Sequence, residues 1–174
     1  MDRNKYKLVF LLIVVTSFSN VLLANIPNFS PIASVALFSG FYLSNKKVAI
    51  IIPIICMLIS DYFIGFHSLM WAVYLSFSAI VILGFFMKKA NGKLIILNSI
   101  FSAVLFFIVT NFAVWSTGSF YPKDFTGLLS CFTMGIPFFK YTLLSAVIFS
   151  LILFGGYEWF NQLVNKYLTA SKRT

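Results

Sequence analysis

The sequence predicts an all-α membrane protein with six transmembrane helices, the second of them short, and with both termini in the cytoplasm. Hydrophobic residues make up 60% of the 174 residues and charged residues only 10%, whereas a soluble domain carries roughly 25% charged residues. The apolar residues form long runs separated by small groups of lysine and arginine, which is typical of a multi-pass membrane protein. The length suits about six spans of ~20 residues, so we expect a single integral membrane domain over residues 1–174.

The first predicted helix, residues 8–24, follows a start that is rich in lysine and arginine. Signal peptides also begin in this way, but the apolar run is long for that role and Asn20 interrupts it. We therefore interpret it as a transmembrane helix. The turn that follows contains two prolines and two asparagines, and Ser30 followed by Pro31 is a favourable start for the second helix.

The second predicted helix, residues 31–44, is short. About 14 residues of α-helix extend ~21 Å, which is less than the ~30 Å of a hydrocarbon core. Small side chains let helices pack closely in membranes, and this helix is rich in them. We predict that it is buried against its neighbours rather than facing lipid. Its small residues are Ala33, Ser34, Ala36, Ser39 and Gly40.

Four further apolar runs predict helices at about residues 48–66, 69–87, 94–115 and 137–160. Pro53 is expected to kink the first of these four. Residues 116–136 are richer in glycine, proline and polar residues, which predicts an outer loop with a short interfacial helix over about 122–134. The sixth helix is predicted to begin near Pro137.

The positive charges predict the orientation of the chain. If the N-terminus is cytoplasmic, only Lys123 and Lys140 of the 13 Lys and Arg residues lie on the outer side. That is a strong bias in the sense of the positive-inside rule, and it makes both termini cytoplasmic. The net charge of +9 is compatible with a nucleic-acid partner in principle. The charges, however, lie in small groups between apolar runs, which indicates a lipid bilayer as the partner and no nucleic acid.

Most of the remaining polar and aromatic residues fall in or near the outer connections, so we expect the outer side to be the binding side. Asp61 lies near the C-terminal end of its helix and Lys140 near the N-terminal end of its own, where the helix macrodipole disfavours each charge. They are expected to pair, to contact a ligand together, or to reach lipid headgroups. The candidate ligand-binding residues are Asn28, Asp61, His67, Trp71, Asn111, Trp115 and Lys140.

Several of these candidates also have simpler interpretations. Trp71 and Trp115 fit an aromatic belt at the membrane interface as well as a pocket for a flat ring. Asn111 lies in an otherwise apolar helix, where its amide needs a partner that a neighbouring helix supplies as readily as a ligand. His67 lies in a turn, where capping or an interfacial position is the alternative to ligand contact.

The sequence contains no P-loop, no dinucleotide-binding fingerprint and no HExxH motif. A single histidine excludes bis-histidine haem ligation and a multi-histidine zinc site, and Cys56 and Cys131 lack metal-ligand spacing. Residues 60–68 contain Ser, Asp and His, but they are crowded into one turn and no G-x-S-x-G accompanies them. We expect no catalytic residue, metal or cofactor, and an enzyme at the outer leaflet ranks third among the functional hypotheses.

Several motifs resemble those of known proteins. The first half contains Asn28-Phe29-Ser30-Pro31, Ala33-x-x-Ala36-Leu37-Phe38-x-Gly40 and Pro53 followed by Ser60-Asp61-x-x-x-Gly65-Phe66-His67. The second half contains Thr110-Asn111-Phe112-x-x-Trp115 and Gly135-Ile136-Pro137-Phe138-Phe139. Together they resemble a family of small six-helix bacterial inner-membrane proteins of unknown function. The architecture and the first three helices are also similar to the S components, the substrate-binding subunits of energy-coupling-factor vitamin transporters.

This resemblance implies an S-component-like bundle in the bacterial cytoplasmic (inner) membrane and an outward-facing pocket. We hypothesise that the chain captures a small vitamin-like ligand for uptake, with the pocket roofed by residues 25–30 and 116–136 and the energy supplied by a separate transporter module. Where S components dock to that module through Ala-x-x-x-Ala, this chain has Thr16-x-x-x-Asn20-x-x-x-Ala24. The alternative is a non-transporting interaction or assembly protein that docks another membrane subunit through the small-residue second helix.

Overall fold

The computed structural model describes residues 3–171 of the chain, with the side chains of residues 9–164 and 166. This part of the chain is all-α and contains six helices, as predicted. Their order follows the apolar runs of the sequence. The helices are α1 (Arg3–Leu22), α2 (Ile32–Tyr42), α3 (Lys46–Ile64), α4 (Met70–Phe86), α5 (Gly92–Thr117) and α6 (Phe125–Ser171).

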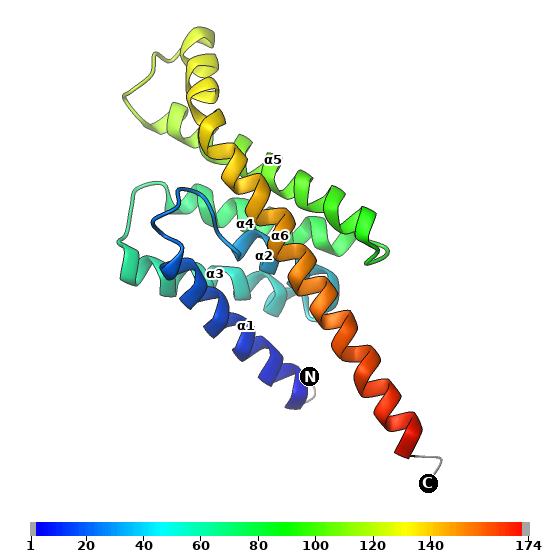
Figure 1. Ribbon diagram of the computed structural model, residues 1–174. Coiled ribbons are helices and arrows are strands. Elements are labelled where there is room, and N and C mark those ends of the chain that lie inside the picture. Colours follow the sequence, from blue (N-terminus) through cyan, green and yellow to red (C-terminus); the bar gives the residue numbers. More distant parts are fainter. Residues whose placement is uncertain (1–2, 172–174) are drawn as a thin grey trace.

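The helices run back and forth between the two ends of one bundle (Figure 1). The connections 23–31, 65–69 and 118–124 lie toward one end, and 43–45 and 87–91 lie toward the other, together with the start of α1 and the end of α6. Consecutive connections thus alternate between the two ends of the bundle. We call the end that carries residues 23–31 and 65–69 the cavity end, and the end around 43–45 the aromatic end.

Helix α2 lies at the centre of the bundle (Figure 1). Residues 32–40 are all buried. Ser34 Oγ donates a hydrogen bond of 2.9 Å to the carbonyl of Ala146 in α6, and Ser39 Oγ donates one of 3.0 Å to the carbonyl of Ala49 in α3. The prediction that this short helix is buried against its neighbours is therefore confirmed.

The crossing of α2 and α4 requires glycine on both helices. A Cβ atom on Gly40 would lie 2.2 Å from the carbonyl oxygen of Val81, and one on Gly84 would lie 2.5 Å from the carbonyl oxygen of Leu37. Both distances are far below van der Waals contact with backbone atoms that cannot rotate away. The two backbones touch directly, which is how small residues stabilise helix pairs in membrane proteins.

Within the described part of the chain, three helical segments are long and apolar enough to cross a membrane: Lys46–Ile64, Gly92–Thr117 and Phe125–Val164. The other helices include shorter apolar stretches, and large apolar side chains such as Phe10, Phe86 and Leu129 are exposed on the surface. A chain with these features fits a membrane protein, because lipid tails cover exposed apolar side chains that water would not.

The last helix differs from the prediction. It begins at Phe125 and continues to Ser171, so the predicted interfacial helix and the helix predicted from Pro137 are one element, and the predicted start near Pro137 is wrong. Proline removes one backbone donor and crowds the carbonyl four residues earlier, but this bends some helices without ending them. Packing of Gly135 against Asn111 of α5 supports the helix here, since a Cβ on Gly135 would lie 2.5 Å from Asn111 Oδ1.

Asp124 explains why α6 begins where it does. Its Oδ1 accepts hydrogen bonds of 2.7 Å from the backbone N–H of Gly127 and from the hydroxyl of Thr126, which is the arrangement of a helix N-cap. The N–H of Gly127, followed by the Thr126 hydroxyl, lowers the pKa of this exposed carboxyl below its ordinary value.

Candidate functional site

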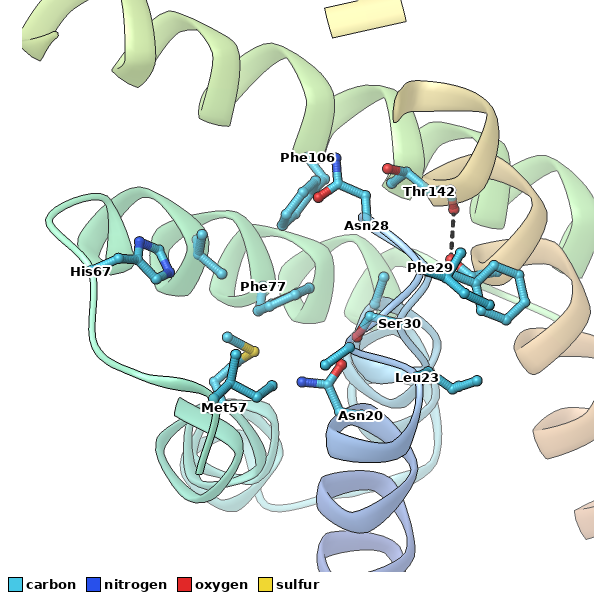
Figure 2. A pocket seen from close by; sticks show the side chains of 16 residues that line it. Asn20, Leu23, Asn28, Phe29, Ser30, Met57, His67, Phe77, Phe106 and Thr142 are labelled. Atoms are coloured by element: carbon cyan, nitrogen blue, oxygen red, sulfur yellow. Dashed lines mark hydrogen bonds between the residues drawn. The ribbon is translucent and has the colours of Figure 1, made fainter. Parts of the chain in front are cut away.

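A cavity of about 220 Å³ opens at the cavity end of the bundle (Figure 2). All six helices contribute to its wall, and the connection of residues 23–31 forms one side of it. Such a volume suits a small organic molecule, and a cavity between helices is a common place for a ligand site in a bundle. Its polar lining residues are Asn20, Asn28, Ser30, His67, Thr142 and Ser145.

The cavity is buried at one side and open at the other. Met57 is 8% exposed and Phe77 only 4%, so these side chains belong to its floor. Asn28, Ile64 and His67 are exposed and belong to its mouth. A molecule from the surroundings of the cavity end therefore has an open path to a floor made of buried side chains.

Asn20 is the most informative polar residue of the site. It lies on the last turns of α1, its side chain is only 9% exposed, and it lines the cavity. Figure 2 shows it pointing into the cavity, toward Met57 and Phe77. Among the described residues, none forms a hydrogen bond with the Asn20 side chain. Its amide atoms are not among the fully buried ones, so in the ligand-free protein water can bond to them inside the cavity, and a ligand with matching groups can take the place of that water.

Asn28, in the connection between α1 and α2, has a backbone conformation that few residues adopt. Its φ of 60° lies in the left-handed region, where asparagine is more readily accommodated than most residues. The turn closes through the N–H of Phe29, which donates to the carbonyl of Ile26 at 3.1 Å. Next to it, Ser30 Oγ accepts a hydrogen bond from the N–H of Ile32 at 3.2 Å, which forms a serine turn just before α2. The turn thereby places an amide and a hydroxyl at the cavity.

His67 lies on the cavity side of the connection between α3 and α4 (Figure 2). The chain leaves α3 through Gly65, whose φ of 118° is strained for any residue with a side chain. The N–H of Gly65 donates to the carbonyl of Asp61 at 2.8 Å and closes α3, and the carbonyl of His67 accepts from the N–H of Met70 at 3.3 Å. These bonds fix the backbone on both sides of the imidazole, which has no hydrogen-bond partner among the described residues.

Aromatic and hydroxyl groups complete the wall. The rings of Phe77 in α4 and Phe106 in α5 stack with centroids 5.3 Å apart and an interplanar angle of 29°. On α6, Ser145 Oγ donates to the carbonyl of Thr142 at 3.1 Å, the bond drawn in Figure 2. Each hydroxyl oxygen that donates to its own helix can still accept a hydrogen bond from a ligand.

Of the seven candidate residues from the sequence, Asn28 and His67 line the cavity, whereas Asp61 and Trp71 do not. Asp61 is 3% exposed, and its Oδ2 accepts a hydrogen bond of 2.7 Å from the hydroxyl of Tyr74 in α4. Lys140, its expected partner, instead lies with Nζ 4.8 Å from the ring centroid of Tyr141. Trp71 is 51% exposed on the surface of α4.

Asn111, Trp115 and Lys140 are also absent from the cavity lining. Asn111 Nδ2 donates to the carbonyl of Phe107 at 2.8 Å and packs against α6, so it stabilises the helix pair. Trp115 Nε1 donates to the carbonyl of Pro122 at 2.8 Å and ties down the following loop. Of the two segments predicted to roof the pocket, residues 25–30 contribute lining residues to this cavity. Residues 116–136 contribute none, since that segment projects past the bundle with α5 and α6 (Figure 1).

The residues that sequence reasoning missed at the site are Asn20 and the α6 hydroxyls of Thr142 and Ser145. Asn20 carried a usable signal, because an amide inside an apolar run needs a polar partner or cavity. The two hydroxyls carried none, since such side chains are common in membrane helices and bond to their own backbone. Within the described residues, no three His, Cys, Asp or Glu side chains are grouped to hold a metal ion, and Cys56 and Cys131 are free.

Within the described residues, the fold and the site define an all-α protein with many exposed apolar side chains and a partly polar cavity between its helices. The chain belongs to the family of unknown function DUF6580, which matches residues 2–169. No curated protein and no solved structure matches the chain. The resemblance to an uncharacterised family is therefore confirmed, and the similarity to S components stays a prediction.

Proposed function

We propose that the protein captures a small organic ligand in this cavity, as the substrate-binding subunit of an uptake system in the bacterial cytoplasmic membrane. The cavity end then faces outward and both termini lie in the cytoplasm, in accord with the positive-inside rule. The observation that carries the proposal is Asn20, a residue only 9% exposed whose amide points into the open cavity and bonds to no other described residue. The resemblance to S components supports it, because those proteins bind vitamins in an outward-facing pocket.

Transport requires a partner in this proposal. The sequence contains no nucleotide-binding motif, so an energising module or another membrane subunit supplies the energy. The described bundle offers a pocket with a buried floor and an exposed mouth, which suits the capture of a small molecule. The hydroxyls, amides and imidazole around it bind and orient, and no nucleophile–base pair is assembled among the lining residues.

The competing hypothesis of an interaction protein is less well supported. It used the small residues of α2 as the contact surface, but Ala33, Ala36 and Gly40 are buried within the bundle by the chain's own helices. A partner could reach them only after the bundle opened. The cavity therefore remains the best supported functional feature.

Native mass spectrometry of the protein, extracted gently from cells in rich medium, tests the proposal. We expect a co-purified small molecule in the wild type, retained by Asn98→Leu and lost from Asn20→Leu. Asn98 is a matched control, because its amide donates to the carbonyl of Leu94 at 2.7 Å, away from the cavity. A wild-type protein that never carries or binds a small molecule contradicts the proposal.

A further inference from the structure

The cavity lining shows which chemical class of ligand the site takes. None of its lining residues, all within the described part of the chain, is Asp, Glu, Lys or Arg. The nearest candidates from the sequence are engaged elsewhere, Asp61 with Tyr74 and Lys140 over Tyr141. A charged group that is buried against the cavity floor loses part of its hydration and needs an opposite charge in return. The cavity floor offers none.

Among the lining residues, a cation finds no carboxylate and an anion finds no Lys or Arg side chain. The N-terminal end of α2 reaches the cavity through Ser30 and Ala33. A helix N-terminus favours anions through its free N–H groups, but Pro31 has no N–H and the N–H of Ile32 is donated to Ser30 Oγ. The partial positive charge that remains suits a carbonyl oxygen of a neutral molecule.

The polar groups that do line the cavity are complementary to an amide-like edge. The carboxamide of Asn20 presents an acceptor and a donor side by side, and asparagine forms paired hydrogen bonds of this kind with the edges of heteroaromatic bases. The amide of Asn28 and the imidazole of His67 offer further donors and acceptors at the mouth. The rings of Phe29, Phe77 and Phe106 supply apolar faces for a flat ring.

From these observations, and resting on the proposed function, we infer that the ligand is an uncharged, planar heterocycle with a lactam, ureide or carboxamide edge. A cavity of about 220 Å³ has room for one or two fused rings. Asn20 pairs with the polar edge at the floor, the phenylalanines contact the ring faces, and Asn28 and His67 contact groups that point toward the mouth.

Matched probes that differ in charge but not in ring test this inference. The purified full-length protein is titrated with nicotinamide, nicotinate and 1-methylnicotinamide, which carry no charge, a negative charge and a positive charge on one ring, and with uracil against orotate. Binding is followed by thermal unfolding and intrinsic tryptophan fluorescence. We expect the neutral member of a series to bind at least about tenfold more tightly, which corresponds to about 1.4 kcal/mol. We expect Asn20→Leu to remove this preference and Asn98→Leu to keep it.

Small molecules that co-purify with the protein are extracted and identified by mass spectrometry in parallel, which covers ligands outside the probe set. A neutral heterocycle in the extract, or tighter binding of the neutral probes, supports the inference. A charged molecule in the extract, or equal or tighter binding of the charged probes, overturns the ligand class and leaves the proposed capture function standing. An empty extract together with no binding of any probe overturns both.

Discussion

The two ends of α2 have opposite surroundings, and the contrast indicates where the protein works. At the aromatic end, the rings of Phe38, Tyr42, Phe154 and Tyr157 contact one another with centroids 4.4–5.5 Å apart. The hydroxyl of Tyr42 donates to Glu158, so the polar group there has a partner. At the cavity end, space is left open and the buried amide of Asn20 has no partner among the described residues.

The same bundle thus fills one end with large rings and leaves the other end hollow. Interiors of proteins are closely packed, and a cavity costs stability in proportion to its volume. Since the chain carries 22 phenylalanines, bulky side chains are not scarce. We interpret the hollow end as the binding end and the aromatic end as the part that holds the helices together.

The largest expected effect on the free energy of unfolding is at the aromatic end. Phe154 is fully buried, and Phe154→Ala should lower the free energy of unfolding by about 3–5 kcal/mol because a cavity replaces the ring. Phe160→Ala on the same helix is the control, since Phe160 is 59% exposed. Denaturation in mixed micelles measures both. Equal stabilities of the two variants would show that the ring cluster does not hold this end together.

The second comparison is between two tyrosine–carboxylate pairs. Tyr74→Phe removes the hydrogen bond to Asp61, which is 3% exposed, and should cost about 1–3 kcal/mol because a buried acceptor loses its partner. Tyr42→Phe removes the bond to the half-buried Glu158 and should cost about 0.5–1.5 kcal/mol, because water can replace the hydroxyl. The same denaturation assay ranks the two variants. The reverse ranking would show that water reaches Asp61 and not Glu158.

At the cavity, a substitution is expected to raise the free energy of unfolding, by a smaller amount than the losses above. Asn20→Leu places an apolar group of similar size against the apolar part of the cavity wall, such as Met57 and Phe77, so the ligand-free protein should gain about 1 kcal/mol in free energy of unfolding. The same variant should lose ligand binding, which separates function from stability at one residue. Thermal unfolding with and without ligand measures both properties. Loss of stability together with loss of binding would instead assign Asn20 a structural role.

The smallest effect is expected at Asp124, which lies beyond the cavity at the start of α6. The N–H of Gly127 lowers the pKa of the Asp124 carboxyl in the folded state. The stabilisation by this carboxylate is therefore fully present above the ordinary carboxyl pKa of about 4. It is lost as the pH falls through the lower, folded-state pKa. Asp124→Ala should therefore be slightly less stable than the wild type at pH 7 and equally stable at strongly acidic pH.

Asp124→Asn is the matched control, because it keeps the acceptor oxygen and removes only the charge. Ligand binding should be the same in all three proteins, since Asp124 does not line the cavity. A difference between Asp124→Ala and the wild type that persists unchanged at acidic pH would show that the carboxylate charge contributes nothing to the cap.

The sequence by itself determined the helices and much of their burial. Six apolar runs separated by basic or turn-forming residues specify six helices, since each run must satisfy its backbone internally wherever it leaves water. The small residues of α2 predicted its central place, because only such a helix lets neighbours approach on all sides. Asn28 and His67 were predicted for the site because they lie in connections at one end of the bundle, which chain order alone assigns.

Only the tertiary structure decided which polar side chains meet. Asp61 and Lys140 were expected to pair, but Asp61 bonds to Tyr74 because the packing of α3 on α4 brings the two together. Asn20 lines the cavity because of the rotation of α1 about its own axis, and Asn111 faces Gly135 because of the crossing of α5 and α6. Local sequence specifies that a helix forms, whereas its rotation and crossing angle depend on contacts between distant residues. The binding site is a product of those contacts.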